Sequence, residues 1–226
     1  MLKTLVALLL TCSAALASAK GPTLEEVKLK AESGDVVAMF SLALRYDQGR
    51  DTPVDKAEAA RWYEKSADGG LAMAQNSLGS MYQAGDGVEK DFGKARLWYQ
   101  KAADQGDAEA TNNLAYLFDE GLGVAEDNTK AIELYTLAAE RGFLRAMLNL
   151  GIMYGRGDGV PVNNIEAYKW LDLARFYTQS SDDRTLKWRS RGFLDELAKK
   201  MSPAEIEAAK KLTTEWDQAH RKKSGA

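Results

Sequence analysis

The chain has a single cysteine, Cys12, and a single histidine, His220, among its 226 residues. Cys12 lies in an N-terminal segment that we expect to be removed, so the remaining chain can form no disulfide and must be stabilised by packed apolar side chains. His220 belongs to a charged C-terminal tail that we expect to be frayed, which disfavours a histidine triad, metal site or general base. The S-x-x-K, G-x-S-x-G and H-E-x-x-H motifs are missing as well. We therefore expect no enzyme, no cofactor and no metal.

A strong excess of either charge is also missing. The chain has 30 basic and 33 acidic residues, a formal charge of -3, with both signs interspersed. The basic run at residues 220–223 is too short to form a nucleic-acid surface, so no nucleic-acid partner is expected. The glycine loops at 121–123 and 155–159 follow no predicted strand and recur in register. We interpret them as turns and not as phosphate-binding loops.

Residues 1–19 are typical of a secretory signal. A lone lysine precedes an apolar run at 5–10, and an A-x-A cleavage sequence ends at Ala19. This run is too short to cross a bilayer, so no stable membrane insertion is expected. A lipoprotein cut before Cys12 is a less favoured alternative, because threonine is a poor residue before such a cut. We expect a periplasmic or secreted protein that begins at Lys20.

The rest of the chain is organised by a repeat of 36 residues. Residues 74–106 can be laid over 38–70, over 110–142 and over the stretch from 146. A fixed period of this size is typical of a solenoid, whose units stack because none can bury its apolar face alone. Small, leucine, aromatic and glycine columns carry the register: Ala38, Ala74, Ala110 and Ala146; Leu42, Leu78, Leu114 and Leu150; Tyr46, Tyr82, Phe118 and Tyr154; Gly49, Gly85, Gly121 and Gly157.

Each unit is predicted to contain two helices. In residues 74–106 the first helix ends at Gly85, which can adopt a left-handed conformation without strain. A second loop glycine, Gly87, recurs as Gly123 and Gly159. The second helix begins after a capping residue, and these caps are Asp55, Asp91, Asp127 and Asn163. Glu58 and Glu166 are placed for a return bond to their caps.

These columns resemble the Sel1-like repeat (SLR), a relative of the tetratricopeptide repeat. The second unit matches its pattern at Leu78, Gly79, Tyr82, Gly85, Gly87, Val88, Asp91, Lys94, Ala95, Trp98, Tyr99, Ala102, Ala103 and Gly106. The first unit departs with Asp51 and Thr52 in place of the second glycine and the valine, followed by Pro53. The resemblance covers residues 24–178. It implies an all-α fold, a right-handed α-solenoid of four to five antiparallel helix pairs with terminal capping helices.

Both ends of the repeat array are expected to be capped. Residues 23–34 resemble the second helix of an incomplete unit, and residues 182–219 a degenerate fifth unit. In the latter, Ser202 and Glu205 predict a helix start at Pro203. The expected segments are a signal peptide (1–19), an N-terminal capping half-repeat (20–37), four repeats (38–73, 74–109, 110–145 and 146–178) and a C-terminal capping helix pair with a basic tail (179–226).

The first helices of such a solenoid line its concave side. If Leu42 and Tyr46 point inward, positions 37, 40, 44 and 47 of each unit face that groove. The resemblance to tetratricopeptide repeats implies that peptides bind there. The candidate partner-binding residues are Phe40, Leu44, Asn76, Ser80, Gln83, Asn112, Tyr116, Asp119, Arg145 and Leu148. The alternative is that the apolar members, Phe40, Leu44, Leu148 and Ile152, pack against the terminal caps.

The sequence thus predicts a monomeric, non-catalytic scaffold or adaptor of the bacterial cell envelope that binds a protein or peptide. A secreted virulence or host-interaction factor is an alternative that shares the same binding physics. An envelope hydrolase of the β-lactamase-like SLR type is less favoured. Its only acidic candidates in the third unit's first helix, Glu109 and Asp119, are about 15 Å apart along the helix axis, too far to share one bond.

Overall fold

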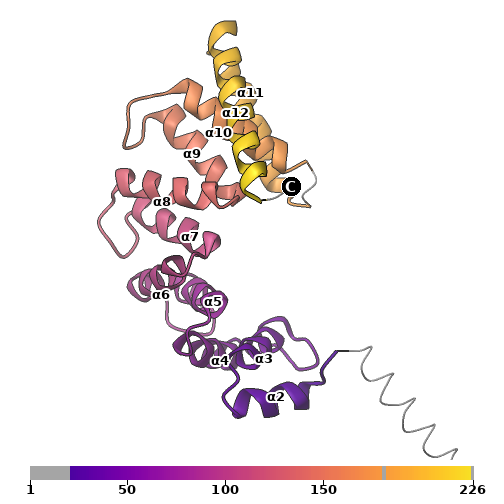
Figure 1. The fold of residues 1–226 in the computed structure, drawn as a ribbon. Helices are drawn as coiled ribbons and strands as arrows, with labels where there is room; N and C mark the ends of the chain where they lie inside the picture. Colours follow the sequence, from indigo (N-terminus) through magenta and orange to yellow (C-terminus); the bar gives the residue numbers. More distant parts are fainter. Residues whose placement is uncertain (1–20, 180–181, 225–226) are drawn as a thin grey trace, which may run out of the picture. The chain divides into compact units, whose positions relative to one another are not determined.

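The computed structural model describes residues 21–179 and 182–224, all of whose regular elements are α-helices (Figure 1). The expected signal peptide at residues 1–19, with Cys12, lies outside this range. The chain divides into two compact units, Met1–Lys90 and Asp91–Ala226. We describe each unit by itself.

The first unit contains four helices in its described part: α2 (Leu24–Glu32), α3 (Val36–Gln48), α4 (Lys56–Asp68) and α5 (Ala72–Ala84). Each helix packs against the next along the chain. The predicted apolar columns form the core, with Leu42, Ala59, Ala74 and Leu78 buried. Asp55 caps α4 by accepting from the Glu58 amide at 2.9 Å. The Glu58 carboxylate binds the indole of Trp62 and the guanidinium of Arg61 instead of supplying the expected return bond.

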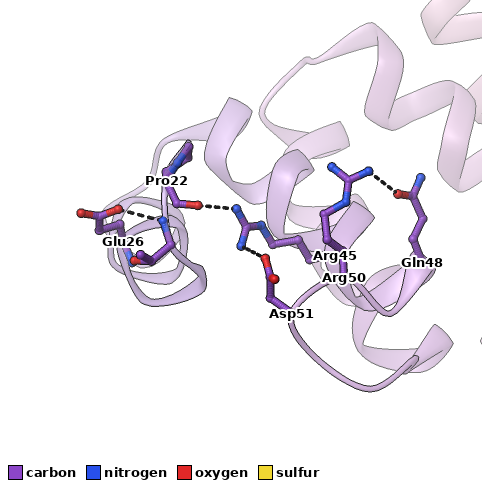
Figure 2. Close-up of polar contacts among 7 residues, drawn as sticks. Pro22, Glu26, Arg45, Gln48, Arg50 and Asp51 are labelled. Carbon is purple, nitrogen blue, oxygen red and sulfur yellow. Dashed lines mark hydrogen bonds and ion pairs between the residues drawn. The ribbon is translucent and has the colours of Figure 1, made fainter. Parts of the chain in front are cut away.

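The N-terminal helix α2 is one turn shorter at its start than its counterpart in the next repeat. It begins at Leu24 after the capping residue Thr23, whose amide donates to Glu26 Oε2 at 2.8 Å. Figure 2 shows that Arg45 of α3 reaches this start. One guanidinium nitrogen donates to the Pro22 carbonyl at 2.6 Å and another to the Asp51 carboxylate at 2.8 Å. Arg45 thus joins the first loop to the beginning of α2.

The second unit contains seven helices in its described part: α6 (Phe92–Asp104), α7 (Ala108–Asp119), α8 (Asn128–Glu140), α9 (Leu144–Arg156), α10 (Asn164–Tyr177), α11 (Arg184–Ala198) and α12 (Pro203–Ser224). Consecutive helices pack together from α6 to α11, and α10 also packs against α12. One core cluster runs from Ala115 through Leu150 and Leu171 to Leu194. The last two helices therefore complete the core of the preceding repeats.

The C-terminal helix α12 confirms the predicted start and corrects the predicted end. Ser202 and Glu205 form the expected reciprocal cap, because the Ser202 amide donates to Glu205 Oε2 at 2.8 Å and the Glu205 amide donates to Ser202 Oγ at 3.3 Å. The predicted fraying at His220 is wrong. Its ring stacks on Trp216 with centroids 3.5 Å apart, and Nε2 lies 2.6 Å from the Glu140 carbonyl oxygen. These contacts hold the end of α12 against the end of α8.

The second loop glycines are required by a close approach between neighbouring repeats. Gly123 and Gly159 have φ values of 66° and 73°. A Cβ on Gly123 would lie 2.7 Å from the Phe92 carbonyl carbon, and one on Gly159 would lie 2.6 Å from Asn128 Cβ. Phe92 and Asn128 are the first residues of α6 and α8. Each loop therefore rests on the first turn of the second helix of the preceding repeat.

Candidate functional site

The second unit contains a groove of about 680 Å³. Its walls come mainly from α7, α9 and α11, with contributions from α8 and from the loops that follow α7 and α9. Leu114 of α7 and Leu150 of α9 are fully buried and do not line the groove. Because these recurring leucines are buried in the core, the groove is lined by other faces of α7 and α9.

Amide side chains and apolar groups form part of the groove lining. Asn149 of α9 donates from Nδ2 to Asn112 Oδ1 of α7 at 3.4 Å, and Asn112 Nδ2 donates to Asn113 Oδ1 at 3.4 Å. Asn112 is only 6% exposed and Leu148 only 1%. Sequence reasoning treated both as open surface residues, and that is wrong. Leu148 belongs to the core cluster that also contains Leu186 of α11, as the alternative interpretation expected.

One end of the groove is acidic. Asp119 ends α7, Glu120 and Glu126 belong to the loop that follows, and Asp158 lies in the loop after α9. Tyr135 donates its hydroxyl to Asp119 Oδ2 at 3.4 Å. Burial, followed by the charge of Glu120, raises the pKa of the Asp119 carboxyl, and Asp158 and Glu126 act in the same direction. This end therefore carries a negative potential that favours a cation on a bound partner.

Basic side chains come from α9 and α11. Arg145 of α9 pairs with Asp183, whose carboxylate also caps α11 by accepting from the Leu186 amide at 2.9 Å. The hydrogen bond from the Leu186 amide, followed by the interaction with Arg145, lowers the pKa of the Asp183 carboxyl. Arg156 and Arg189 line the groove as exposed side chains. The groove therefore offers both signs of charge to one occupant.

Five of the ten predicted partner-binding residues line this groove: Asn112, Tyr116, Asp119, Arg145 and Leu148. Tyr116 is 37% exposed and presents a flat ring with a hydroxyl. The remaining five belong to the first unit: Phe40, Leu44, Asn76, Ser80 and Gln83. The structure does not bring these five into the groove of the second unit.

The five predicted residues of the first unit differ in their surroundings. Phe40 is half-buried, with its ring 5.6 Å from that of Tyr63, and Leu44 is also half-buried. Asn76 is buried, which again contradicts the open position expected from the sequence. Ser80 is exposed and donates to the Asn76 carbonyl at 3.2 Å, while Gln83 is half-buried.

Sequence reasoning missed the contribution of α11. Thr185, Arg189 and Phe193 of this helix line the groove. Extending the 36-residue spacing from Ile152 would instead select Trp188, which is 76% exposed and does not line it. The buried leucines of α11 are the signal that could have shown which face of this helix lines the groove, because they fix how the helix is turned against its neighbours.

Within residues 21–179 and 182–224, no group of histidine, cysteine, aspartate and glutamate side chains is arranged to hold a metal ion. The helices of the same ranges include none with the length and apolar character needed to span a bilayer.

Helix pairs of constant length, joined by glycine loops and capped at regular intervals, define a helical repeat protein of the α-solenoid class. The Sel1 repeat family model matches residues 36–71, 72–107, 108–143 and 144–175. This chain belongs to the Sel1 repeat family, whose scaffolds are typical of protein-interaction proteins. The matched units begin two residues before the ones chosen from the sequence. Comparison with curated proteins gives no match.

Solved structures support the same assignment. A protective antigen of uropathogenic Escherichia coli with an SLR fold is 30% identical, with a TM-score of 0.78 over 86% of this chain and 40% of that one. This chain therefore spans less than half the length of that protein. A Sel1 repeat protein from Oxalobacter formigenes is 27% identical, with a TM-score of 0.68 over 77% of this chain and 75% of that one. A Klebsiella pneumoniae protein, 19% identical with a TM-score of 0.52 over 85% of this chain and 100% of that one, shows the fold alone.

Proposed function

We propose that this protein is a non-catalytic scaffold that binds a segment of a partner protein in the groove of its second unit. The observation that carries the proposal is the groove itself, which brings together side chains from three successive first helices, α7, α9 and α11. Five of the residues selected from the sequence for partner binding line it. The family's typical use as an interaction scaffold supports the same conclusion.

The chemistry of the groove suits an extended polypeptide segment. Asn149 supplies an amide that can bond the N–H and C=O groups of a partner backbone, and the buried Asn112 holds this amide in place by accepting from its Nδ2. Tyr116 supplies the kind of aromatic surface that often anchors an interface. The carboxylates around Asp119 and the guanidinium of Arg189 can orient a segment that carries both charges.

We further propose that the protein acts in the bacterial cell envelope after export. Residues 1–19 support this, with an apolar run and an A-x-A sequence that ends at Ala19. The mature protein should then begin at Lys20. Intact-mass measurement on exported protein tests the proposal, and a lipid-bearing species that starts at Cys12 would replace it with a lipoprotein.

A host-interaction role is the second candidate. It is favoured by the similarity to the protective antigen of uropathogenic Escherichia coli, a protein more than twice as long as the matched part. The two roles share the groove and differ in the partner. Crosslinking in envelope extract and in host-cell extract separates them, because each role predicts a specific adduct in one extract only.

A photo-crosslinking experiment tests the groove directly. A benzoylphenylalanine residue is placed at Tyr116, on the first helix of the third repeat, or at Leu137, on the second helix of the same repeat. The two native side chains are matched in exposure, at 37% and 39%. We expect a specific adduct from position 116 and none from 137. Adducts from 137 alone would overturn the groove proposal.

A further inference from the structure

Helix α11 carries a second surface that neither the core nor the groove explains. Trp188 is 76% exposed, the highest value among the large hydrophobic side chains described as exposed. Leu186, Leu194 and Leu197 form the buried side of the same helix. Arg184, Arg191 and Gly192 lie one helical turn from Trp188 along the chain and share its outward face. We refer to these four residues as the Trp188 ridge.

One charge of the ridge, Arg184 in the first turn, is unfavourably placed for the helix that bears it. Between Arg184 and Arg191 every charged residue is basic, and the first turn of α11 has no acidic residue. Cations near the start of a helix oppose its macrodipole. Asp183 offsets part of this cost, because its carboxylate accepts from the Leu186 amide at the helix start and also pairs with Arg145. Helix stability alone therefore does not favour an arginine at position 184.

Gly192 is a second feature without an internal reason. It lies in the interior of α11, where glycine is destabilising relative to alanine. A Cβ at this position would meet nothing within 4 Å, so no neighbouring element requires the glycine. Gly192 follows Trp188 by one turn and leaves the helix surface beside the indole open. A partner side chain can therefore reach the ring at this point.

We propose that the Trp188 ridge is a second docking surface, which binds an acidic segment of a partner protein. Trp188 supplies the apolar anchor, and Arg184 and Arg191 supply the positive charge. Arg191 Nε also lies 3.8 Å from Asp195 Oδ2, in an exposed pair that a carboxylate of the partner would replace. Tryptophan and arginine are the residues that most often dominate the energy of protein interfaces. A lipid surface is a poorer fit, because the apolar side of α11 is buried in the core and only one aromatic side chain remains to insert.

The proposal is tested with two labelled peptides and the full chain. One peptide alternates pairs of glutamate with leucine, and the other has glutamine in place of glutamate. Fluorescence anisotropy at low salt should show the acidic peptide binding at least about tenfold more tightly. Trp188→Ala, and Arg184→Glu with Arg191→Glu, should each weaken this binding by about tenfold or more. Equal affinities for the two peptides, or no effect of Trp188→Ala, would overturn the proposal.

Two matched variants locate the peptide on the chain. Lys211→Glu reverses a comparably exposed charge on α12 and should change the affinity by less than about twofold. Tyr116→Ala lies in the groove and should also leave the affinity unchanged. If Tyr116→Ala removes binding, the acidic peptide occupies the groove and the ridge proposal fails. Tighter binding to phosphatidylglycerol vesicles than to the acidic peptide would instead identify a membrane-binding surface.

Thermal unfolding provides a readout that a merely structural role would not produce. Gly192→Ala and Arg184→Glu should each raise the unfolding midpoint, by about 2 °C, while they lower the affinity for the acidic peptide. A variant that stabilises the helix and loses the ligand is the result expected of a surface kept for binding. If Gly192→Ala lowers the midpoint, the glycine has a packing role and the argument is wrong.

Discussion

The loop between the two helices of a repeat differs between the first and the third repeat at the position of the second glycine. In the third repeat, Gly123 has a φ of 66° and lies directly against the start of α6. In the first repeat, Asp51 adopts nearly the same conformation, with a φ of 61°, and it is the only non-glycine residue with positive φ in the described part of the chain. The loop conformation therefore does not by itself require glycine. Glycine is required at residue 123 because the start of α6 leaves no room for a Cβ atom there.

The difference follows from the length of the neighbouring helix. α2 begins at Leu24, one turn later than the 36-residue spacing from α4 would place it. The loop of the first repeat therefore has room for a Cβ at residue 51. The Asp51 carboxylate uses this room to bind Arg45, which also bonds the Pro22 carbonyl (Figure 2). A side-chain bridge at the end of the array thus takes the place of a backbone contact inside it.

Leu114→Ala should have the largest effect on stability. It also provides a reference for the comparison, because the first repeat has a leucine, Leu42, at the same repeat position. Leu114 is fully buried, and its truncation should lower the free energy of unfolding by about 2–5 kcal/mol through loss of contacts and a residual cavity. Urea denaturation measures the loss. Leu42→Ala in the first repeat is the matched variant, and an unchanged midpoint for both would mean that the leucine column is not the core.

Gly123→Val should have the next largest effect, a loss of about 2–4 kcal/mol, because it combines a disfavoured φ with a collision against α6. Gly106→Ala is the control. Gly106 has a φ of 93° with nothing near its would-be Cβ, so only strain remains and about 1 kcal/mol should be lost. Equal losses from the two variants, measured by urea denaturation, would show that the contact with α6 is unimportant.

Arg45→Ala tests the bridge of the first repeat. Its guanidinium bonds both Pro22 and Asp51, and its side chain is only 12% exposed. We expect a loss of about 1–2 kcal/mol, discounted for the exposed carboxylate. Arg50→Ala is the control, since Arg50 is exposed and donates to Gln48 Oε1 at 3.3 Å (Figure 2). Thermal unfolding should separate the two variants; if they behave alike, the bridge does not stabilise the first loop.

Asp51→Gly should have the smallest effect, within about 0.5 kcal/mol of the parent. The lost bond to Arg45 is offset by relief of the left-handed strain at a non-glycine residue. Differential scanning calorimetry at matched pH gives the comparison. A loss as large as that from Gly123→Val would show that the two loops depend on the same interaction after all.

Much of the fold was predictable because its determinants are local and periodic. The caps at Asp91 and Asp127, and the glycines that recur every 36 residues, are confirmed in the structure. The replacement of the second loop glycine by Asp51, which binds Arg45, was not predictable, because it depends on where α2 begins. That start is set by the cap at Thr23 and lies outside the repeat pattern.

The groove was predictable in part. Tyr116, Asp119 and Arg145 lie on it as the columns predict. The burial of Asn112 could not be foreseen, because it depends on Asn149 reaching across from the next repeat. The contribution of α11 was not predicted, because the packing of this helix against α9 and α10 decides which of its faces lines the groove, and the 36-residue spacing does not encode that packing.

The proposed function of this protein is partner binding in the groove of α7, α9 and α11. The most direct measurement is calorimetric titration of the peptide identified by crosslinking at position 116 into the full chain and its variants. Tyr116→Ala should weaken binding by about 1 kcal/mol or more, roughly fivefold, and Asn112→Ala by a similar amount with helicity retained. Lys101→Ala and Glu64→Ala, on the second helices α6 and α4, should change little. Loss of binding in these two variants, with the groove variants unaffected, would contradict the account.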